Sequence, residues 1–211
     1  FFMLLNKAIK NNMHQFTKHL PKEVKKIAVI KADAYGHGAV ELSKVALEEG
    51  VFCLAVATVD EGIFLRNAGF NCPIMLFSLP CLEELDLLVQ NDLTPFVFEE
   101  YFVEELNKSA KKFDKTINVH IKIDTGMSRI GCDYKEVLSL AKKIQSLSNL
   151  NLQGVGTHLC VSDCTKKILG TFAENPTPIQ KLQLWHAVLE FFINILPETP
   201  ENIPVDDDSR R

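Results

Sequence analysis

The chain has 211 residues, of which 46% are hydrophobic and 24% are charged, and its formal net charge is −4 at pH 7. These values predict one soluble globular domain, and the negative charge argues against a nucleic-acid-binding surface. No apolar run reaches the roughly 18 residues that cross a bilayer, and the apolar N-terminus lacks the basic start and the cleavage site of a signal peptide. We therefore expect a cytoplasmic protein.

Apolar runs of strand length alternate with stretches of helical periodicity, and the connections between them are short. This is the pattern of parallel β/α units. Thr58, with Glu61 three residues later, predicts a capping box, and Gly50 and Gly69 suit helix ends. In chain order we predict helix 3–19, strand 26–31, helix 39–49, strand 51–57, helix 59–68, strand 73–77, helix 81–90, strand 94–98, helix 99–112, strand 118–123, helix 134–146, strand 152–157 and helix 178–195.

Six strands with intervening helices fit two architectures. One is a doubly wound open sheet. The other is a (β/α)8 barrel, which would be incomplete here because a closed barrel needs eight strands and typically about 250 residues. The pattern alone leaves both open.

The six cysteines form no Cys-x2-Cys pair. Cys160 and Cys164 with His158 resemble part of a metal-ligand set, but no matching second pair exists. We expect buried free thiols in a reducing cytoplasm and no metal site.

The first predicted strand ends in a lysine. Lys31 follows the apolar run 27–30, and Tyr35, Gly36 and Gly38 come before the next helix. The carboxyl ends of strands are where α/β proteins place their chemistry. A partly desolvated lysine amine can form a Schiff base with an aldehyde, and glycines at a helix start let backbone N–H groups bind an anion. Pyridoxal phosphate satisfies both conditions; the alternative is a lysine that merely reaches solvent.

A second informative stretch runs from His120 to Gly131. Lys122 lies inside a predicted strand, on the same face as His120 and Asp124, and Arg129 follows the strand end. A charge in a barrel interior must be paired or neutralised, and a guanidinium suits a phenolate or phosphate oxygen. The alternative is a salt bridge among Lys122, Asp124 and Arg129.

Three segments resemble the alanine racemases. They read Lys-Ala-Asp-Ala-Tyr-Gly-His-Gly at 31–38, Lys-x-Asp-Thr-Gly-Met-x-Arg-x-Gly at 122–131 and Gly-Val-Gly-Thr-His at 154–158. The first is highly specific, and the last is weak by itself. The resemblance covers about residues 3–195. It implies an α/β fold, a (β/α)8 TIM-type barrel that is incomplete here, with about six β/α units.

The resemblance also implies a role for each matching residue. Lys31 would be the catalytic lysine that binds the cofactor pyridoxal 5′-phosphate covalently, and Tyr35 would contact the phosphate. Arg129 would donate to the ring hydroxyl oxygen of the cofactor. Lys122, which is often carbamylated in the family, would steady Arg129. His158 would lie below the cofactor ring, although a core histidine bonded to a neighbour is the alternative reading.

By this resemblance the protein is an isomerase that interconverts L-alanine and D-alanine for peptidoglycan synthesis, and full-length members are homodimers. The family chain adds two strands, a β-rich C-terminal domain and a second catalytic base, a tyrosine. None of Tyr35, Tyr101 and Tyr134 fits that role. We expect a partial barrel domain at 1–196, a Pro-rich acidic tail at 197–211 and no C-terminal domain. The first residue is not methionine, which suggests a fragment or a truncated form.

Two other readings stay open from the sequence. One is a non-catalytic protein that binds pyridoxal phosphate and maintains its supply. The other is an inactive remnant.

Overall fold

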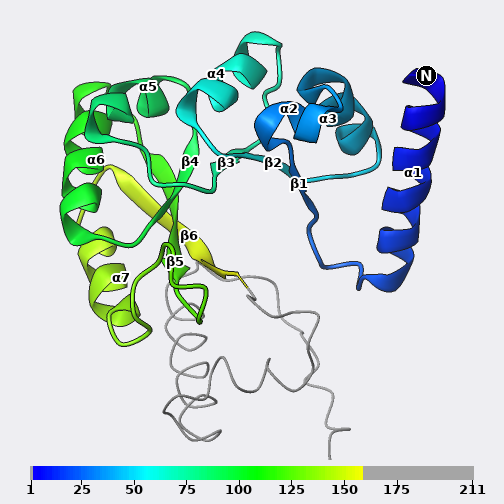
Figure 1. Cartoon of the computed structure of the whole chain (residues 1–211). Helices are drawn as coiled ribbons and strands as arrows, with labels where there is room; N and C mark the ends of the chain where they lie inside the picture. Colours follow the sequence, from blue (N-terminus) through cyan, green and yellow to red (C-terminus); the bar gives the residue numbers. More distant parts are fainter. Residues whose placement is uncertain (1, 159–211) are drawn as a thin grey trace, which may run out of the picture. The chain divides into compact units, whose positions relative to one another are not determined.

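A computed structural model describes residues 2–158, with side chains from residue 7 onward. These residues form a six-stranded parallel sheet in which each strand pairs with the one before it (Figure 1). Consecutive order is that of a barrel and not of a doubly wound sheet, whose order reverses at a switch point, so the expected partial barrel is confirmed. The strands are β1 Ile27–Val29, β2 Cys53–Val56, β3 Ile74–Leu76, β4 Thr94–Val97, β5 Ile117–Ile123 and β6 Leu150–Thr157.

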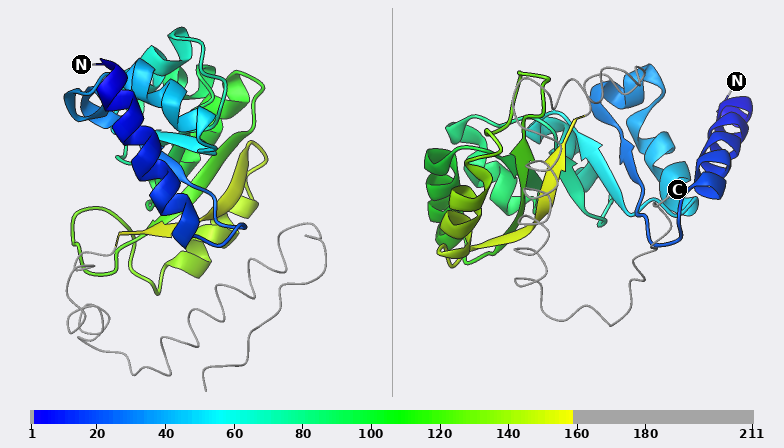
Figure 2. Two further views of the ribbon diagram at one scale, coloured as in Figure 1. Left: turned by 90° about the vertical axis from the view of Figure 1, so that its right-hand side faces the viewer. Right: turned by 90° about the horizontal axis from the view of Figure 1, so that it is seen from below.

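Helices follow the strands as the alternation predicts, and they lie around one side of the sheet (Figures 1 and 2). Their ends differ from the predicted ends by a few residues, which is common at frayed termini. The predicted helix 81–90 is a short 3₁₀ turn followed by an α-helix, and the predicted helix 178–195 lies outside the described residues. The elements are α1 Phe2–His19, α2 Lys31–Gly36, α3 Ala39–Glu48, α4 Val59–Asn67, η1 Leu82–Glu84, α5 Leu85–Gln90, α6 Glu100–Lys112 and α7 Val137–Gln145.

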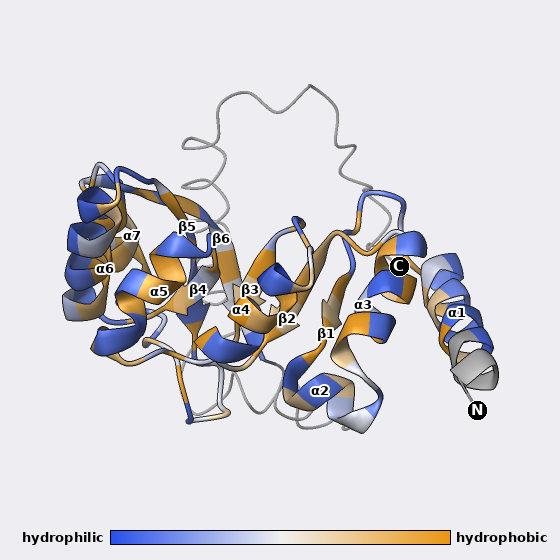
Figure 3. Ribbon diagram, turned by 90° about the horizontal axis from the view of Figure 1, so that it is seen from above, coloured by the Kyte–Doolittle hydropathy of each residue, from blue (hydrophilic) through white to orange (hydrophobic). Residues whose placement is uncertain are grey.

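The strands β2 and β3 are buried on both faces. Every residue of β2 and β3 is buried, as continuous apolar runs predict for a parallel sheet that helices cover. In Figure 3 the strands are mostly orange, whereas the outer helices alternate between orange and blue. A cluster on one face of the sheet contains Cys53, Ala55 and Met75, with Val29, Phe77 and Phe96 packed against it.

The expected caps are present. The Thr58 hydroxyl accepts from the Glu61 N–H at 3.3 Å, and the Glu61 carboxylate accepts from the Thr58 N–H, so α4 begins with a full capping box. Gly50 and Gly69 follow α3 and α4 with φ of 76° and 91°, the left-handed conformation that ends helices.

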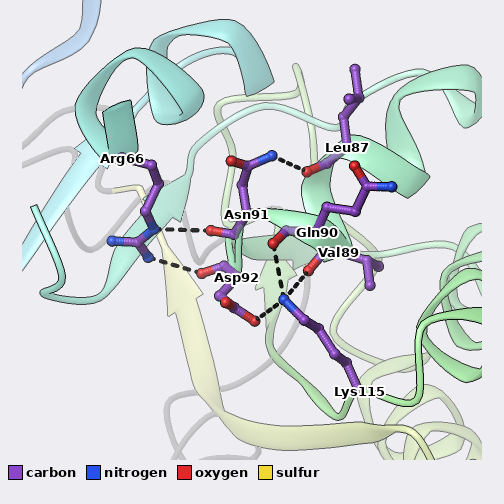
Figure 4. Close-up of polar contacts among 7 residues, drawn as sticks. All are labelled: Arg66, Leu87, Val89, Gln90, Asn91, Asp92 and Lys115. Carbon is purple, nitrogen blue, oxygen red and sulfur yellow. Dashed lines mark hydrogen bonds and ion pairs between the residues drawn. The ribbon is translucent and has the colours of Figure 1, made fainter. Parts of the chain in front are cut away.

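One arginine joins the segments that precede β3 and β4, at the amino-terminal edge of the sheet. Arg66 donates to four backbone carbonyls: Nε to Asn91 at 2.9 Å, Nη1 to Phe70 and Cys72 at 2.7 Å each, and Nη2 to Asp92 at 3.0 Å. Figure 4 shows the contacts to Asn91 and Asp92. A planar guanidinium has several donors in fixed directions, which a single ammonium lacks.

Lys115 extends this arrangement to the start of β5 (Figure 4). Its Nζ donates to the carbonyls of Val89 and Gln90 at 3.1 and 2.9 Å and pairs with an Asp92 carboxylate oxygen at 2.9 Å. Two cations therefore fix this edge, at the opposite end of the strands from Lys31.

Four cysteines lie in the described part, and none of them forms a disulfide there. Cys53 and Cys132 are buried, and burial raises the pKa of the Cys53 thiol to about 12 and that of Cys132 to about 11. Cys81 is exposed, and its hydrogen bond to Glu84 raises its pKa. Cys160 and Cys164 lie outside the described residues. Residues 2–158 contain no group of three potential metal-ligating side chains.

The thiolate is the reactive form of cysteine, so burial predicts an order of modification. With iodoacetamide at pH 8 we expect Cys81 to react in the native protein, whereas Cys53 and Cys132 react only after denaturation in guanidinium. Peptide mass spectrometry measures each rate. Native Cys53 reacting as fast as Cys81 would contradict the burial described here.

Among residues 2–158, no helix has the length and apolar character needed to span a membrane.

Candidate active site at the carboxyl edge of the sheet

The chain leaves β1 in a rare conformation. Ala32, Asp33, Ala34 and Tyr35 have φ between 51° and 57°, which makes the start of α2 a left-handed helical turn. Each such residue costs roughly 1–2 kcal/mol for an L-amino acid with a Cβ. Strain of this kind persists only where the surroundings fix it, and it collects at functional sites. The sequence predicted a loop here, but not its handedness.

Local hydrogen bonds hold the turn. The Ala34 N–H donates to the Ile30 carbonyl at 2.8 Å, and the Ala34 side chain is buried. The Asp33 carboxylate accepts from the Ala39 N–H at 2.6 Å, at the first residue of α3. The turn is thus tied both to the strand before it and to the helix after it.

Lys31 and Tyr35 lie side by side on this turn. Lys31 is half-buried, and its Nζ is 5.8 Å from the centre of the Tyr35 ring, while Tyr35 is 62% exposed. A Cβ at Gly36 or Gly38 would meet no atom of the described residues within 4 Å, so that part of the chain leaves space open beside the turn. Among the described side chains Lys31 forms no ion pair.

A cavity of about 350 Å³ lies between this turn and α4. Its walls are mainly apolar, and three acidic residues, Asp33, Asp60 and Glu61, are among those that line it. Carboxylates repel an anion, so we do not assign a phosphate to this cavity.

On β5, Lys122 is only 8% exposed. Burial lowers the pKa of its ammonium; the nearby Arg129 lowers it further, while Asp124 opposes this effect. Its Nζ donates to the Ile123 carbonyl at 3.2 Å, and the residue pairs with Gly156 across to β6. A buried amine with a depressed pKa is more readily neutral, which is the form that reacts with carbon dioxide.

The alternative salt bridge among Lys122, Asp124 and Arg129 does not form within residues 2–158. One Asp124 carboxylate oxygen instead accepts from the N–H groups of Gly126 and Ser128, at 2.9 and 3.0 Å. Asp124 therefore shapes the loop that carries Arg129.

That loop closes on itself. The Cys132 N–H donates to the Lys122 carbonyl and the Asp124 N–H donates to the Cys132 carbonyl, both at 3.0 Å. Gly131 stands at the closure with φ of 128°, and a Cβ there would lie 2.6 Å from the Asp124 nitrogen. Arg129 projects into solvent from the closed loop.

The ends of β5 and β6 are joined by two threonines that the sequence analysis did not single out. The hydroxyls of Thr125 and Thr157 lie 2.7 Å apart, and Thr157 donates to the Ile123 carbonyl at 2.9 Å. Thr125 also donates to the His158 carbonyl at 3.3 Å. His158 is exposed just past β6, and its place below the cofactor ring stays a prediction.

An aromatic row crosses the sheet below this edge. The ring centres of Phe77 and Phe96 are 5.7 Å apart, and those of Phe96 and His120 are 5.9 Å apart. Cβ atoms at Gly154 and Gly156 would lie 3.0 Å from the His120 ring and 2.6 Å from the Phe96 ring. The Gly-x-Gly of β6 is thus needed because these rings pack against bare backbone. Burial lowers the pKa of His120, which favours a neutral imidazole.

The structure brings the predicted residues together in two groups. Lys31 and Tyr35 share the turn after β1, and Lys122, the Arg129 loop and His158 share the ends of β5 and β6. All five lie at the carboxyl edge of one sheet, but no hydrogen bond or ion pair joins the two groups in the described part of the chain.

Comparison with known proteins matches this chain to one family model, "Alanine racemase, N-terminal domain", over residues 6–189. An alanine racemase of Treponema denticola is 44% identical over 181 residues, which is 82% of this chain and 48% of that protein. The crystal structure of alanine racemase from E. faecalis is similar with a TM-score of 0.76 and 32% identity, over 92% of this chain and 50% of the other. The alanine racemase of Bacillus anthracis with bound L-Ala-P gives a TM-score of 0.73 at 32% identity, over 86% and 47%.

Proposed function

We infer the function from one fact, which is that this chain belongs to the alanine racemase family. We propose that these residues bind pyridoxal 5′-phosphate and carry one of the two proton transfers that interconvert L-alanine and D-alanine. The chain spans about half the length of the curated relatives it matches. We therefore propose the complete racemisation only for a protein as long as these relatives.

The residues present fit this cofactor. Lys31 supplies an amine beside open space, and the Tyr35 phenol is exposed next to it, where it can donate to a phosphate oxygen. Arg129 supplies a fixed positive charge at the same edge of the sheet. The placement of Lys31 supports this cofactor site: it lies one residue beyond Ile30, which follows β1, on a strained turn with Tyr35 beside it.

Lys31 would hold the cofactor through its Nζ, and the same nitrogen would take or return the substrate proton. When bound, the cofactor withdraws electrons from the Cα–H bond of the amino acid. Arg129 would donate to the ring hydroxyl oxygen of the cofactor, and His158 would lie below its ring. A carbamate on Lys122 would turn a buried cation into an anion that pairs with Arg129. Inversion also needs a base on the opposite face, and we assign none within residues 2–158.

We further propose that the reaction supplies D-alanine for cell-wall synthesis in the cytoplasm, and that the full-length protein acts as a homodimer. Family membership supports these statements.

The purified chain is expected to bind pyridoxal 5′-phosphate at Lys31. Mixing the two, reducing with borohydride and digesting should give one modified peptide, with close to one label per chain on Lys31. Mass spectrometry locates the modified residue. Lys31→Ala should lose this label completely, because the expected adduct forms on the Lys31 amine itself, and Arg129→Ala should require more cofactor for half-maximal label.

Label spread evenly over surface lysines, or an unchanged adduct in Lys31→Ala, would overturn the assignment. Label on Lys31 with no exchange of the alanine Cα proton in deuterated water would favour the non-catalytic, cofactor-binding alternative.

A further inference from the structure

The Glu61 carboxylate joins three segments of the chain. Its Oε2 accepts from the Ala57 N–H at 2.7 Å and from the Thr58 N–H at 3.3 Å, which completes the cap of α4. Its Oε1 accepts from the Ala32 N–H at 2.7 Å. A capping box needs only the bond to the helix cap, so the contact with Ala32 is additional.

This extra contact holds the chain on the C-terminal side of Lys31, where Ala32 is bonded to Glu61 at the start of α4. On the N-terminal side of Lys31, the Ile30 N–H donates to the Ala55 carbonyl of β2 at 2.7 Å. Lys31 is therefore the single residue between two points that are anchored to the β2–α4 unit.

Ala32 is also the first residue of the left-handed turn. A hydrogen bond to a carboxylate is roughly twice as strong as one between neutral groups. This bond therefore helps to offset the cost of four successive left-handed residues.

We propose that Glu61 is a positioning residue for the cofactor lysine: it sets the direction in which Lys31 leaves β1 by holding the Ala32 N–H. The inference rests on the proposed function, because Lys31 is the group that is positioned. Glu61 itself would touch neither cofactor nor substrate.

Glu61→Gln separates this role from ordinary helix capping. Glutamine offers one acceptor oxygen, which cannot serve both Ala32 and the cap. Glu84→Gln is a matched control. Glu84 caps η1 through Oε2 alone, which accepts from the Cys81 N–H at 2.9 Å, so the single oxygen of glutamine can keep that bond. Thr58→Ala is a second control, because it removes the other half of the α4 cap and leaves the Ala32 contact in place.

Two measurements decide the matter. Without cofactor, hydrogen exchange of the amides in 31–36 should become about tenfold faster in Glu61→Gln and change less than twofold in Glu84→Gln and Thr58→Ala. The pyridoxal phosphate concentration that half-labels Lys31 should likewise rise about tenfold in Glu61→Gln alone. Circular dichroism confirms that each variant is folded.

Unchanged exchange in Glu61→Gln, or an equal effect in Thr58→Ala, would overturn the proposal. Failure of the wild-type chain to label Lys31 would instead refute the proposed function, and the exchange measurement would still decide whether Glu61 holds the turn.

Discussion

Arg66→Met is expected to lower the free energy of unfolding by about 2–4 kcal/mol. The guanidinium satisfies four backbone carbonyls that precede β3 and β4, and methionine retains much of the aliphatic stem but none of the donors. A hydrogen bond from a charged donor contributes about 1.5–3 kcal/mol, but the four share one side chain and are not additive. Urea denaturation followed by circular dichroism measures the loss.

Arg66→Lys should recover only part of the loss, because one ammonium cannot reach carbonyls in four directions. Lys108→Met removes a lysine whose only described partner is Glu105 on the same helix, and it should leave the urea midpoint nearly unchanged. If Arg66→Met unfolded at the same urea concentration as Lys108→Met, the arginine would not hold this edge together.

Gly131→Ala is expected to cost about 2–4 kcal/mol and to raise the cofactor concentration that half-labels Lys31. The added Cβ would lie 2.6 Å from the Asp124 nitrogen and 2.9 Å from the Ile123 carbonyl carbon. Both are backbone atoms, so no side-chain rotation relieves the contact, and φ of 128° adds strain for alanine. Relief requires the loop to open, which would displace Arg129.

Gly69→Ala is the matched control, since φ is 91° there and no atom of residues 2–158 lies within 4 Å of the added Cβ. It should cost only the backbone strain of roughly 1–2 kcal/mol and leave labelling unchanged. Equal losses of stability and of labelling in the two variants would show that the contact with Asp124 has no effect.

The sequence was sufficient for the order of elements, because strand and helix periodicities are local properties. The capping box of Thr58 and Glu61 was likewise predicted correctly. The left-handed turn was not, since alanine and tyrosine have no local preference for positive φ and only tertiary contacts hold them there.

Long-range contacts account for the remaining omissions in the site. The bond from Ala32 to Glu61 and the pair of Thr125 and Thr157 join residues about 30 positions apart, which periodicity cannot reveal. The close packing of Phe96 on Gly156 likewise became visible only in the folded sheet.

The order of strand pairing also bears on how the chain assembles while it is being made. Synthesis proceeds from the N-terminus at about 5–20 residues per second, so each new β/α unit meets a strand edge that has already emerged. Within residues 2–158 the outer edges of β1 and β6 have no neighbouring strand; of these two the β1 edge is made first, and Ile27 on it is 43% exposed. This edge is open for longest on the ribosome, so unwanted pairing between nascent chains would begin there.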